Sequence, residues 1–410
     1  MQTLTLKEGL QSLQVLQTKE TEIAVSRLAE LTLPTKKTEE YRYFDIDALL
    51  SKKWQIYRAK KADIKVSDIV EIVDGVVVSA PKELLVSYSA QRDIDTKHFD
   101  ALYYLGHILS PEVIELHCKS DANIKIVHRF TQASVLLAYR LQIKTSPNIS
   151  VNIAESFDGH AAKDTFVLYG YDLHVQRDAR VELIKDETLI EGSYVPVYSN
   201  FIELEAQSTV NIFSFDFGNA DGLQLLRAKL GENSTFNAKH LLYAKGNGKR
   251  GTVSHIVHAK KNATSSQKAK NILQDKARGI FDALIKIEHE GGGTKAYQNS
   301  QAVLLNDGAY MASKPQLEIY IDDVEASHGS SIGELDEEQL FYLRSRGITL
   351  QEAKKILILA FANDIIDGIE DREMRESVHI SFENVYYGES QLECMATCHN
   401  CSDTIIGEKS

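Results

Sequence analysis

The chain has 410 residues, of which 46 are basic and 58 acidic, giving a net charge of −12 at neutral pH. Charged residues make up 25% and hydrophobic residues 43% of the composition, values typical of a folded globular protein rather than a disordered chain or a small disulfide-rich domain. The negative net charge repels phosphate backbones and anionic membranes, so we expect neither nucleic acid nor a membrane as a partner.

The sequence contains no recognisable targeting or membrane segment. Residues 1–9 lack a basic stretch followed by an apolar run, and the longest apolar run near the C-terminus, residues 356–362, is far shorter than a membrane span. Three of the four cysteines lie within eight residues, which is poor geometry for a disulfide framework in a chain of this size. We therefore expect a cytoplasmic protein in a reducing compartment.

A mainly helical region is expected first, over residues 1–74. Apolar residues between positions 6 and 31 recur mostly at helical spacing, and Pro34 ends this pattern. Tyr41, Tyr43 and Phe44 follow in a charged stretch without a clear period. We expect these aromatic side chains to pack the helix onto a neighbouring core.

The central part of the chain reads as strands. From about residue 75 to residue 323 apolar residues alternate with a period of two, and no helix-length apolar period interrupts them. This disfavours an alternating βαβ architecture and leaves a sandwich, a propeller or a solenoid. Short polar turns recur, and each leads into a small residue, namely Ala179, Ser208, Ser234 and Ala263. Successive small residues are 29, 26 and 29 positions apart. Such a period suits the coils of a β-helix, which we place at residues 75–333.

The alternation ends near Val324, and helix signals replace it. Residues 336–339 and 349–352 both read as capping boxes; the first of these helices is expected to stop at Gly347, and a third helix is expected from about residue 371 to residue 387. The sequence therefore predicts a C-terminal helical domain at residues 334–390, followed by a cysteine-containing tail at residues 391–410.

No catalytic motif stands out. A phosphate-binding loop and a Gly-x-Ser-x-Gly nucleophile elbow are both missing from the sequence. The glycine-rich residues 291–296 superficially follow a dinucleotide-binding fingerprint, but no helix-length crossover follows them. His255 and His258 are three apart on an expected strand, so they point to opposite faces and are better explained as structural residues. We therefore expect a non-catalytic protein.

One cluster has the spacing of a metal site. Cys394, Cys398 and Cys401 follow a Cys-x3-Cys-x2-Cys pattern, which can bring three thiolates, together with His399, around zinc or an iron–sulfur cluster. Near the end of the chain such a site would bind metal transiently rather than hold the fold together. The alternative is that these residues bind no metal.

A long segment of the sequence is recognisable. Residues 322–348 closely resemble the C-terminal signature of the SufD branch of the SufB/SufD family, which belongs to the SUF iron–sulfur cluster assembly machinery. The match is supported by shorter segments, namely residues 33–40, 266–267, 275–281, 294–299 and 314–319. In this chain His-Gly is followed by Gly-x-Leu-Asp, which is more similar to SufD than to the His-Glu-Ala pattern expected of SufB.

The resemblance implies a right-handed parallel β-helix flanked by helical regions, in a complex with SufB and the ATPase SufC. It assigns to His328 a role in iron entry or cluster assembly; the alternative is a structural histidine that is hydrogen-bonded in a turn. Some relatives carry a cysteine two residues earlier, where this chain has Ala326. The resemblance also implies SufC docking by the helical element that contains Leu340, Phe341, Tyr342, Leu343, Arg346 and Gly347.

We therefore expect a scaffold subunit that holds no cofactor tightly and that handles iron or a nascent cluster transiently within the complex. A SufB-like cluster scaffold is the second hypothesis. A polysaccharide-active β-helix enzyme and a self-sufficient metalloprotein that uses the cysteine cluster are less favoured alternatives. The sequence does not show whether the chain forms a homodimer or whether the complex binds a flavin.

Overall fold

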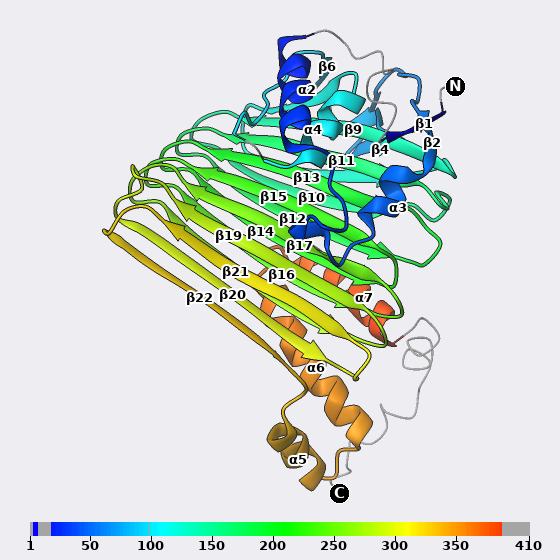
Figure 1. Cartoon of the computed structure of the whole chain (residues 1–410), viewed down its shortest axis with the longest axis vertical. Coiled ribbons are helices and arrows are strands. Elements are labelled where there is room, and N and C mark those ends of the chain that lie inside the picture. The colour runs from blue at the N-terminus through cyan, green and yellow to red at the C-terminus, as the bar shows by residue number, and fades with distance from the viewer. Residues whose placement is uncertain (1–2, 7–17, 98, 388–410) are drawn as a thin grey trace, which may run out of the picture.

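The computed structural model describes residues 3–6, 18–97 and 99–387 of the chain (Figure 1). Its architecture is a parallel β-solenoid of about eight turns with helices at both ends, which confirms the predicted fold class. Figure 1 shows the strands stacked as a long ladder, with the N-terminal helices at one end and the C-terminal helices beside the other.

Two sheets, which the chain visits alternately, form the solenoid. Sheet 1 contains β1 (Thr3–Thr5), β2 (Lys53–Tyr57), β9 (Val135–Thr145), β11 (Phe166–Val175), β13 (Val195–Leu204), β15 (Gly222–Leu230), β17 (Lys249–His258), β19 (Arg278–Ile287) and β21 (Tyr310–Ile319), in that order, with β6 (Leu85–Ser89) and β7 (Val113–Cys118) at its side. Sheet 2 contains β22 (Val324–Gly333), β20 (Thr294–Leu304), β18 (Thr264–Leu273), β16 (Thr235–Ala244), β14 (Thr209–Gly218), β12 (Arg180–Leu189), β10 (Ser150–Asp158), β8 (Ala122–Arg129), β4 (Val70–Val73), β5 (Val76–Ala80) and β3 (Lys65–Val66). From β8 to β22 neighbouring strands within a sheet pair in parallel, so equivalent positions of successive coils lie beside each other.

The corners explain the period read from the sequence. Four polar residues adopt a left-handed backbone with φ between 55° and 62°, namely Asp178, Gln207, Asn233 and Asn262. Each is followed by one of the predicted small residues, which are at most 1% exposed. The left-handed residue turns the chain into the next strand, and a small side chain then fits inside the bend. The predicted corners are confirmed.

The N-terminal region contains both helices and strands. Helix α2 (Lys19–Leu31) begins with a capping box at Thr18, and η2 (Glu39–Tyr41) and α3 (Ile46–Ser51) follow it. This confirms the helical pattern from Lys19 onward, whereas residues 7–17 lie outside the described residues. Tyr41 and Phe44 are buried, as expected of residues that anchor the helix. Strands β1 to β4 also belong to this region: β1 and β2 are part of sheet 1, and β3 and β4 are part of sheet 2.

One helix was missed by the sequence analysis, which expected an uninterrupted series of strands. Helix α4 (Ala101–Leu109) lies between α2 and the outer face of sheet 1, and all nine of its residues are buried. Asp100 caps it by accepting a hydrogen bond from the Leu102 amide at 2.7 Å. Because α4 is covered on every side, its nine residues are almost all apolar, and so short an apolar run cannot be told from a buried strand in the sequence.

A buried ion pair holds α4 against sheet 1. The Arg140 guanidinium donates two hydrogen bonds to Asp172, at 3.0 and 3.1 Å, and Tyr103 on α4 donates to the same carboxylate at 2.7 Å. Burial opposes ionisation of Asp172, but Arg140 holds the pKa of this carboxyl well below its usual range. Gly170 makes room for the guanidinium, because a Cβ at this position would lie 2.7 Å from Arg140 Nη1.

The alternating pattern fades near Val324, but β22 continues sheet 2 to Gly333, within the range 75–333 that the sequence suggests for the β-helix. The predicted helices follow as α5 (Glu337–Ser345), α6 (Leu350–Ile366) and α7 (Arg372–Tyr387). Helices α6 and α7 pack on the outer face of sheet 2, where Ile358, Ala362 and Phe382 meet a layer of phenylalanine and leucine side chains. None of the described helices is long and apolar enough to cross a membrane.

Candidate functional site

His328 lies on β22, the last strand of sheet 2, and not in a turn. Its backbone partner on β20 is Gln298, which in turn pairs with Gln267 on β18. Gln267 and Gln298 are buried inside the solenoid, so His328 occupies the same inward-facing row. It is exposed because no further coil of the described chain covers it.

The imidazole of His328 reaches across to the other sheet. Its Nδ1 lies 2.9 Å from the carbonyl oxygen of Pro315 on β21. A carbonyl oxygen only accepts hydrogen bonds, so Nδ1 must carry the proton. In the neutral imidazole Nε2 then keeps its lone pair, which is the form that binds a metal ion or accepts a proton.

The neighbouring inward positions of β22 are neutral. Ser330 donates a hydrogen bond to Ser313 on β21 at 2.9 Å, a second link between the two sheets in this last layer. Ala326 packs against the solenoid core, so this position offers only a methyl group and no metal-binding atom. Glu325 accepts a hydrogen bond from Tyr297 on the outer side of the strand. In the described part of the chain, no group of three or more His, Cys, Asp and Glu side chains is arranged to hold a metal ion.

Helix α5 contains most of the predicted docking residues, and none of its side chains is buried. Phe341 is 75% and Tyr342 54% exposed. The Arg346 guanidinium lies 4.4 Å from the centre of the Tyr342 ring. Gly347, with φ of 88°, ends the helix as predicted, because glycine adopts a left-handed backbone without strain.

Local capping signals fix the ends of α5 and α6. Asp336 accepts hydrogen bonds from the amides of Glu338 and Gln339, at 2.9 and 3.0 Å, without the reciprocal bond of a full box. Thr349 and Glu352 form the complete capping box that the sequence predicts. The two helices therefore start where expected, although only α6 is anchored in the core.

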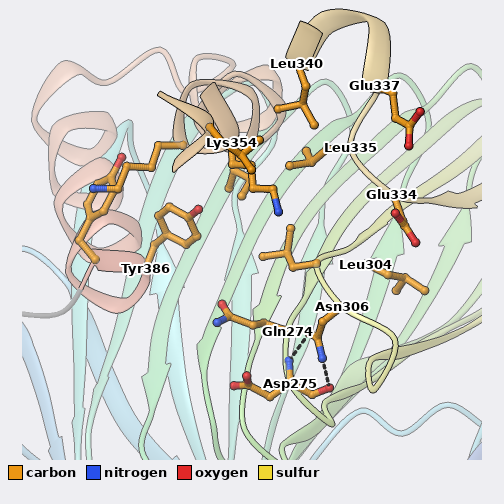
Figure 2. Close-up of a pocket in the computed structure, with 15 residues that line it drawn as sticks. Gln274, Asp275, Leu304, Asn306, Glu334, Leu335, Glu337, Leu340, Lys354 and Tyr386 are labelled. Atoms are coloured by element: carbon orange, nitrogen blue, oxygen red, sulfur yellow. Dashed lines mark hydrogen bonds between the residues drawn. The ribbon is translucent and has the colours of Figure 1, made fainter. Parts of the chain in front are cut away.

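A groove of about 730 Å³ separates these helices from the last coils of the solenoid (Figure 2). Leu340 of α5, Leu335 before it and Tyr386 of α7 line the groove on one side, and Leu304 and the turn around Asp275 line it on the other. The Asp275 amide donates to Asn306 at 2.6 Å, and the Asn306 amide group donates back to the Asp275 carbonyl at 2.8 Å. Leu340 thus faces the groove, whereas Phe341 faces solvent.

The other sequence motifs have structural explanations or lie outside the described residues. Residues 291–293 turn the chain from β19 into β20, and a Cβ at Gly293 would lie 2.2 Å from Asn262 Oδ1, so the glycine is required for close packing. His258 is buried and hydrogen-bonded to Ser265 at 2.8 Å. Cys394, Cys398, His399 and Cys401 lie outside the described residues. Cys118 is buried, which raises the pKa of its thiol to about 11 and makes it unreactive.

The polar residues inside the solenoid were not predicted from the sequence. Lys185, Glu187, Asp216 and Arg250 form a buried cluster, in which Lys185 Nζ lies 2.6 Å from Asp216 and Arg250 lies 3.1 Å from Glu187. Gln267 and Gln298 continue this polar interior toward His328. A repeat of polar residues at about 30-residue spacing was the available signal, because Gln267, Gln298 and His328 are 31 and 30 residues apart.

Comparison with known proteins places the chain in a family. A family model described as "SUF system FeS cluster assembly, SufBD core domain" matches residues 128–361, which is more than half of the chain. The iron–sulfur cluster assembly protein SufD of Escherichia coli is 26% identical over 379 residues, covering 86% of this chain and 89% of that protein. A SufBD family protein of Synechocystis is 25% identical over 302 residues, covering 70% and 66%. The SufD of Bacillus subtilis is 31% identical over 139 residues, covering 34% and 32%.

The matched region contains nearly the whole solenoid, His328 and all the predicted docking residues. The resemblance stated from residues 322–348 is therefore confirmed, with SufD proteins among the relatives. The chain belongs to the SufBD family of the SUF iron–sulfur cluster assembly system.

Proposed function

We propose that this chain is a non-catalytic scaffold subunit that pairs with SufB through the end of its solenoid and binds the ATPase SufC through its C-terminal helices. Its family and its SufD-named relatives support a role in SUF iron–sulfur cluster assembly. We propose in addition the pairing with SufB, the docking of SufC and a cytoplasmic location. The observation that carries it is the uncovered last layer of the solenoid, with His328 facing inward.

The last strands, β21 and β22, favour pairing with another solenoid. Both are edge strands, whose free backbone N–H and C=O groups can pair with a further strand. Ile319 and Ile332 occupy inward-facing positions of this layer and are 44% and 47% exposed. A solenoid that ends with an open apolar interior requires a cap, and the end of SufB would continue both sheets and cover these side chains.

Helix α5 favours docking of a second protein. Phe341 and Tyr342 are large and exposed, and the Arg346 guanidinium lies over the Tyr342 ring. Aromatic and arginine side chains are the residue types that dominate binding energy at interfaces. Since no side chain of α5 is buried, the helix is available as a contact surface without unfolding the core. We assign this surface to SufC, and the missing phosphate-binding loop agrees with an ATPase supplied by the partner.

His328 is proposed as the point where iron enters or a nascent cluster forms, with no tightly bound cofactor. Its Nε2 lone pair can serve as one ligand, since Nδ1 is held by Pro315. The layer around it has no second ligand of the thiolate type because position 326 is alanine. The remaining ligands would come from SufB, so iron is handled as cargo of the complex.

Co-purification tests the proposal. We expect the tagged chain to recover both SufB and SufC from cells, and Phe341→Ala and Leu343→Ala to lose SufC while SufB is retained. Ile380→Ala is the matched control, because Ile380 is an equally apolar side chain, 59% exposed, on α7. Retention of SufC by both α5 variants would refute the docking assignment, and recovery of neither partner by the wild-type chain would refute the scaffold role.

We also propose, from spacing alone, that Cys394, Cys398, Cys401 and His399 bind iron or zinc transiently. Removal of residues 391–410 is expected to lower the metal content of the purified complex, measured by elemental analysis. Unchanged iron and zinc in the truncated complex would exclude this site.

A further inference from the structure

Part of the N-terminal region reaches the far end of the solenoid. Between α2 and α3 the chain crosses the outer face of sheet 1 (Figure 1), and we call residues 32–45 the N-terminal segment. Its residues Glu39 and Tyr43 contact Lys314 and Tyr310 on β21, which are 275 and 267 positions away in the sequence. The N-terminal segment therefore lies over the last strand of sheet 1, at the edge that the described chain leaves unpaired.

Two contacts join the N-terminal segment to β21. The rings of Tyr43 and Tyr310 lie 5.3 Å apart between centres, and their hydroxyl oxygens are 3.2 Å apart. Glu39 accepts a hydrogen bond from the Lys314 ammonium at 2.5 Å, and the same ammonium lies 3.5 Å from Asp282 on β19. Both contacts are made on sheet 1, so they distinguish β21 from β22, the edge strand of sheet 2.

Two arginine side chains flank the tyrosine pair. The Arg278 guanidinium lies 5.2 Å from the centre of the Tyr310 ring, and the Arg42 guanidinium lies 5.7 Å from the centre of the Tyr43 ring. Within the described part of the chain neither guanidinium forms an ion pair with a carboxylate, whereas Lys314 has two such partners. We call Arg42, Tyr43, Arg278 and Tyr310 the rim patch.

The rim patch has the composition of a binding surface. Tyr310 is 38% exposed, Arg42 is exposed, and Tyr43 and Arg278 are half-buried. Tyrosine and arginine are the residue types enriched among the side chains that dominate binding energy at interfaces. Each unpaired guanidinium can also bind a carboxylate of a partner through two hydrogen bonds. The patch therefore fits a partner that presents an apolar or aromatic side chain next to a carboxylate.

A strand added to β21 would lie against the rim patch. Lys249, Arg278 and Tyr310 are strand partners on β17, β19 and β21, so they form one row across sheet 1. The next strand of a continued sheet would lie about 4.8 Å beyond β21 and would place its own residue in this row. That side chain would contact the Tyr310 ring, against which Tyr43 packs. The rim patch is thus continuous with the edge at which a second solenoid is proposed to pair.

We propose that the rim patch is part of the docking surface for the second solenoid, SufB, whose pairing strand presents an apolar or aromatic side chain to the tyrosine pair and a carboxylate to the guanidinium groups. This inference rests on the proposed pairing with SufB. It adds that the N-terminal segment, which lies outside the coils, takes part in that pairing. Because the patch lies on sheet 1 alone, it determines which of the two sheets of SufB continues sheet 1.

Binding of purified SufB to the full-length chain tests the inference. Tyr310→Ala and Arg42→Glu are each expected to raise the dissociation constant about tenfold, as for side chains that dominate an interface. Tyr387→Ala is the matched control, because Tyr387 also has a cation over its ring, Lys355 Nζ at 4.6 Å, but lies on α7 beside sheet 2. Wild-type affinity of both rim-patch variants would overturn the inference.

Photo-cross-linking keeps the inference testable if a substitution weakens the fold. Tyr43→benzoylphenylalanine retains an aromatic ring at this position, and the complex with SufB is irradiated after it has formed. A covalent product with SufB is expected from this variant and not from Ile380→benzoylphenylalanine, because Ile380 is exposed on α7. An intact complex that gives no product from position 43 would overturn the inference.

These measurements separate the inference from the function on which it rests. If the wild-type chain does not bind SufB at all, the proposed pairing fails and the inference fails with it. If Ile332→Lys, at the open end, abolishes SufB binding while Tyr310→Ala and Arg42→Glu bind normally, the pairing stands. In that case SufB binds the open end without the N-terminal segment, and only the inference fails.

Discussion

The buried carboxyl groups of this protein fall into two groups, which differ in whether a positively charged side chain lies beside them. Asp172 and Asp216 are enclosed but face guanidinium or ammonium groups at about 3 Å, so they remain ionised. Asp186 on β12 is different: it lies under α7 and accepts a hydrogen bond from the Ser381 hydroxyl at 2.8 Å, while its other carboxyl oxygen, Oδ1, has no hydrogen-bond partner among the described residues. Burial raises the pKa of Asp186 from 3.8 to about 7.

The raised pKa of Asp186 predicts a pH-dependent stability. Below about pH 4 the carboxyl is protonated in both the folded and the unfolded chain, so it does not affect their difference. Between about pH 4 and pH 7 the unfolded chain loses the proton while the folded chain keeps it, so folding becomes less favourable as pH rises. Above pH 7 the destabilisation is complete and on the order of 4 kcal/mol.

We therefore expect Asp186→Asn to raise the free energy of unfolding at pH 8 and to have little effect at pH 4, as measured by denaturant unfolding at a series of pH values. Asp307→Asn is the control, because Asp307 is exposed on a turn between β20 and β21. Equal effects of the Asp186 substitution at pH 4 and pH 8 would show that Asp186 is not titrating under α7.

At the scale of elements, the three C-terminal helices differ in how they are held. Helices α6 and α7 bury Ile358, Ala362, Val378 and Phe382 against sheet 2, and Lys270 of β18 lies 2.6 Å from Asp364 of α6. Helix α5 buries none of its side chains, so its position depends on its caps and on the short links at either end. A change in its position would therefore cost no buried side-chain contacts, which agrees with the docking role proposed for α5.

The elements that sequence analysis predicted correctly are those with local signals. The capping box at Thr349, the glycine stop at Gly347 and the small corner residues act within a few positions of the chain, and each was found in place. Helix α4 was missed because it is short and almost wholly apolar, so its sequence resembles that of a buried strand. The alternation fades along β22, inside the range expected for the β-helix, because the inward face of this strand is open at the end of the solenoid and does not require apolar residues.

Only part of the candidate site could be predicted from the sequence, because its geometry depends on contacts between distant segments of the chain. His328 and the exposed aromatic residues of α5 were singled out by family resemblance. The inward orientation of His328, its contact with Pro315 and the polar layer at Gln298 and Ser300 depend on strand register between coils about 30 residues apart. Register is set by the packing of the whole solenoid and cannot be read from a local pattern.

At the scale of the whole molecule, the two ends of the solenoid are finished differently. At the N-terminal end, antiparallel pairs of β4 with β5 and of β6 with β7 accompany the first coils, and α2 and α4 cover sheet 1. At the other end β21 and β22 are the edge strands of the described chain; α6 and α7 pack on the outer face of sheet 2, and α5 lies past β22 (Figure 1). This asymmetry makes the C-terminal end the surface at which a second solenoid is expected to bind.

Ile332 allows a direct test of this surface. It faces inward, in register with Ala302, and is 47% exposed, so a second solenoid that continues the sheets would bury it. We expect Ile332→Lys to abolish co-purification of SufB, because an unpaired ammonium would be enclosed in the interface. The free energy of unfolding of the isolated chain should change little, since lysine at this position remains in solvent.

Ser331→Lys is the matched control, because Ser331 is the preceding residue on the same strand and points outward. It introduces the same charge without placing it in the proposed interface, so it should leave SufB binding intact. Sedimentation of each purified variant also separates the two partners that can cover this end: if Ile332→Lys dissociates a homodimer of this chain but still binds SufB, the open end serves self-association and SufB binds elsewhere.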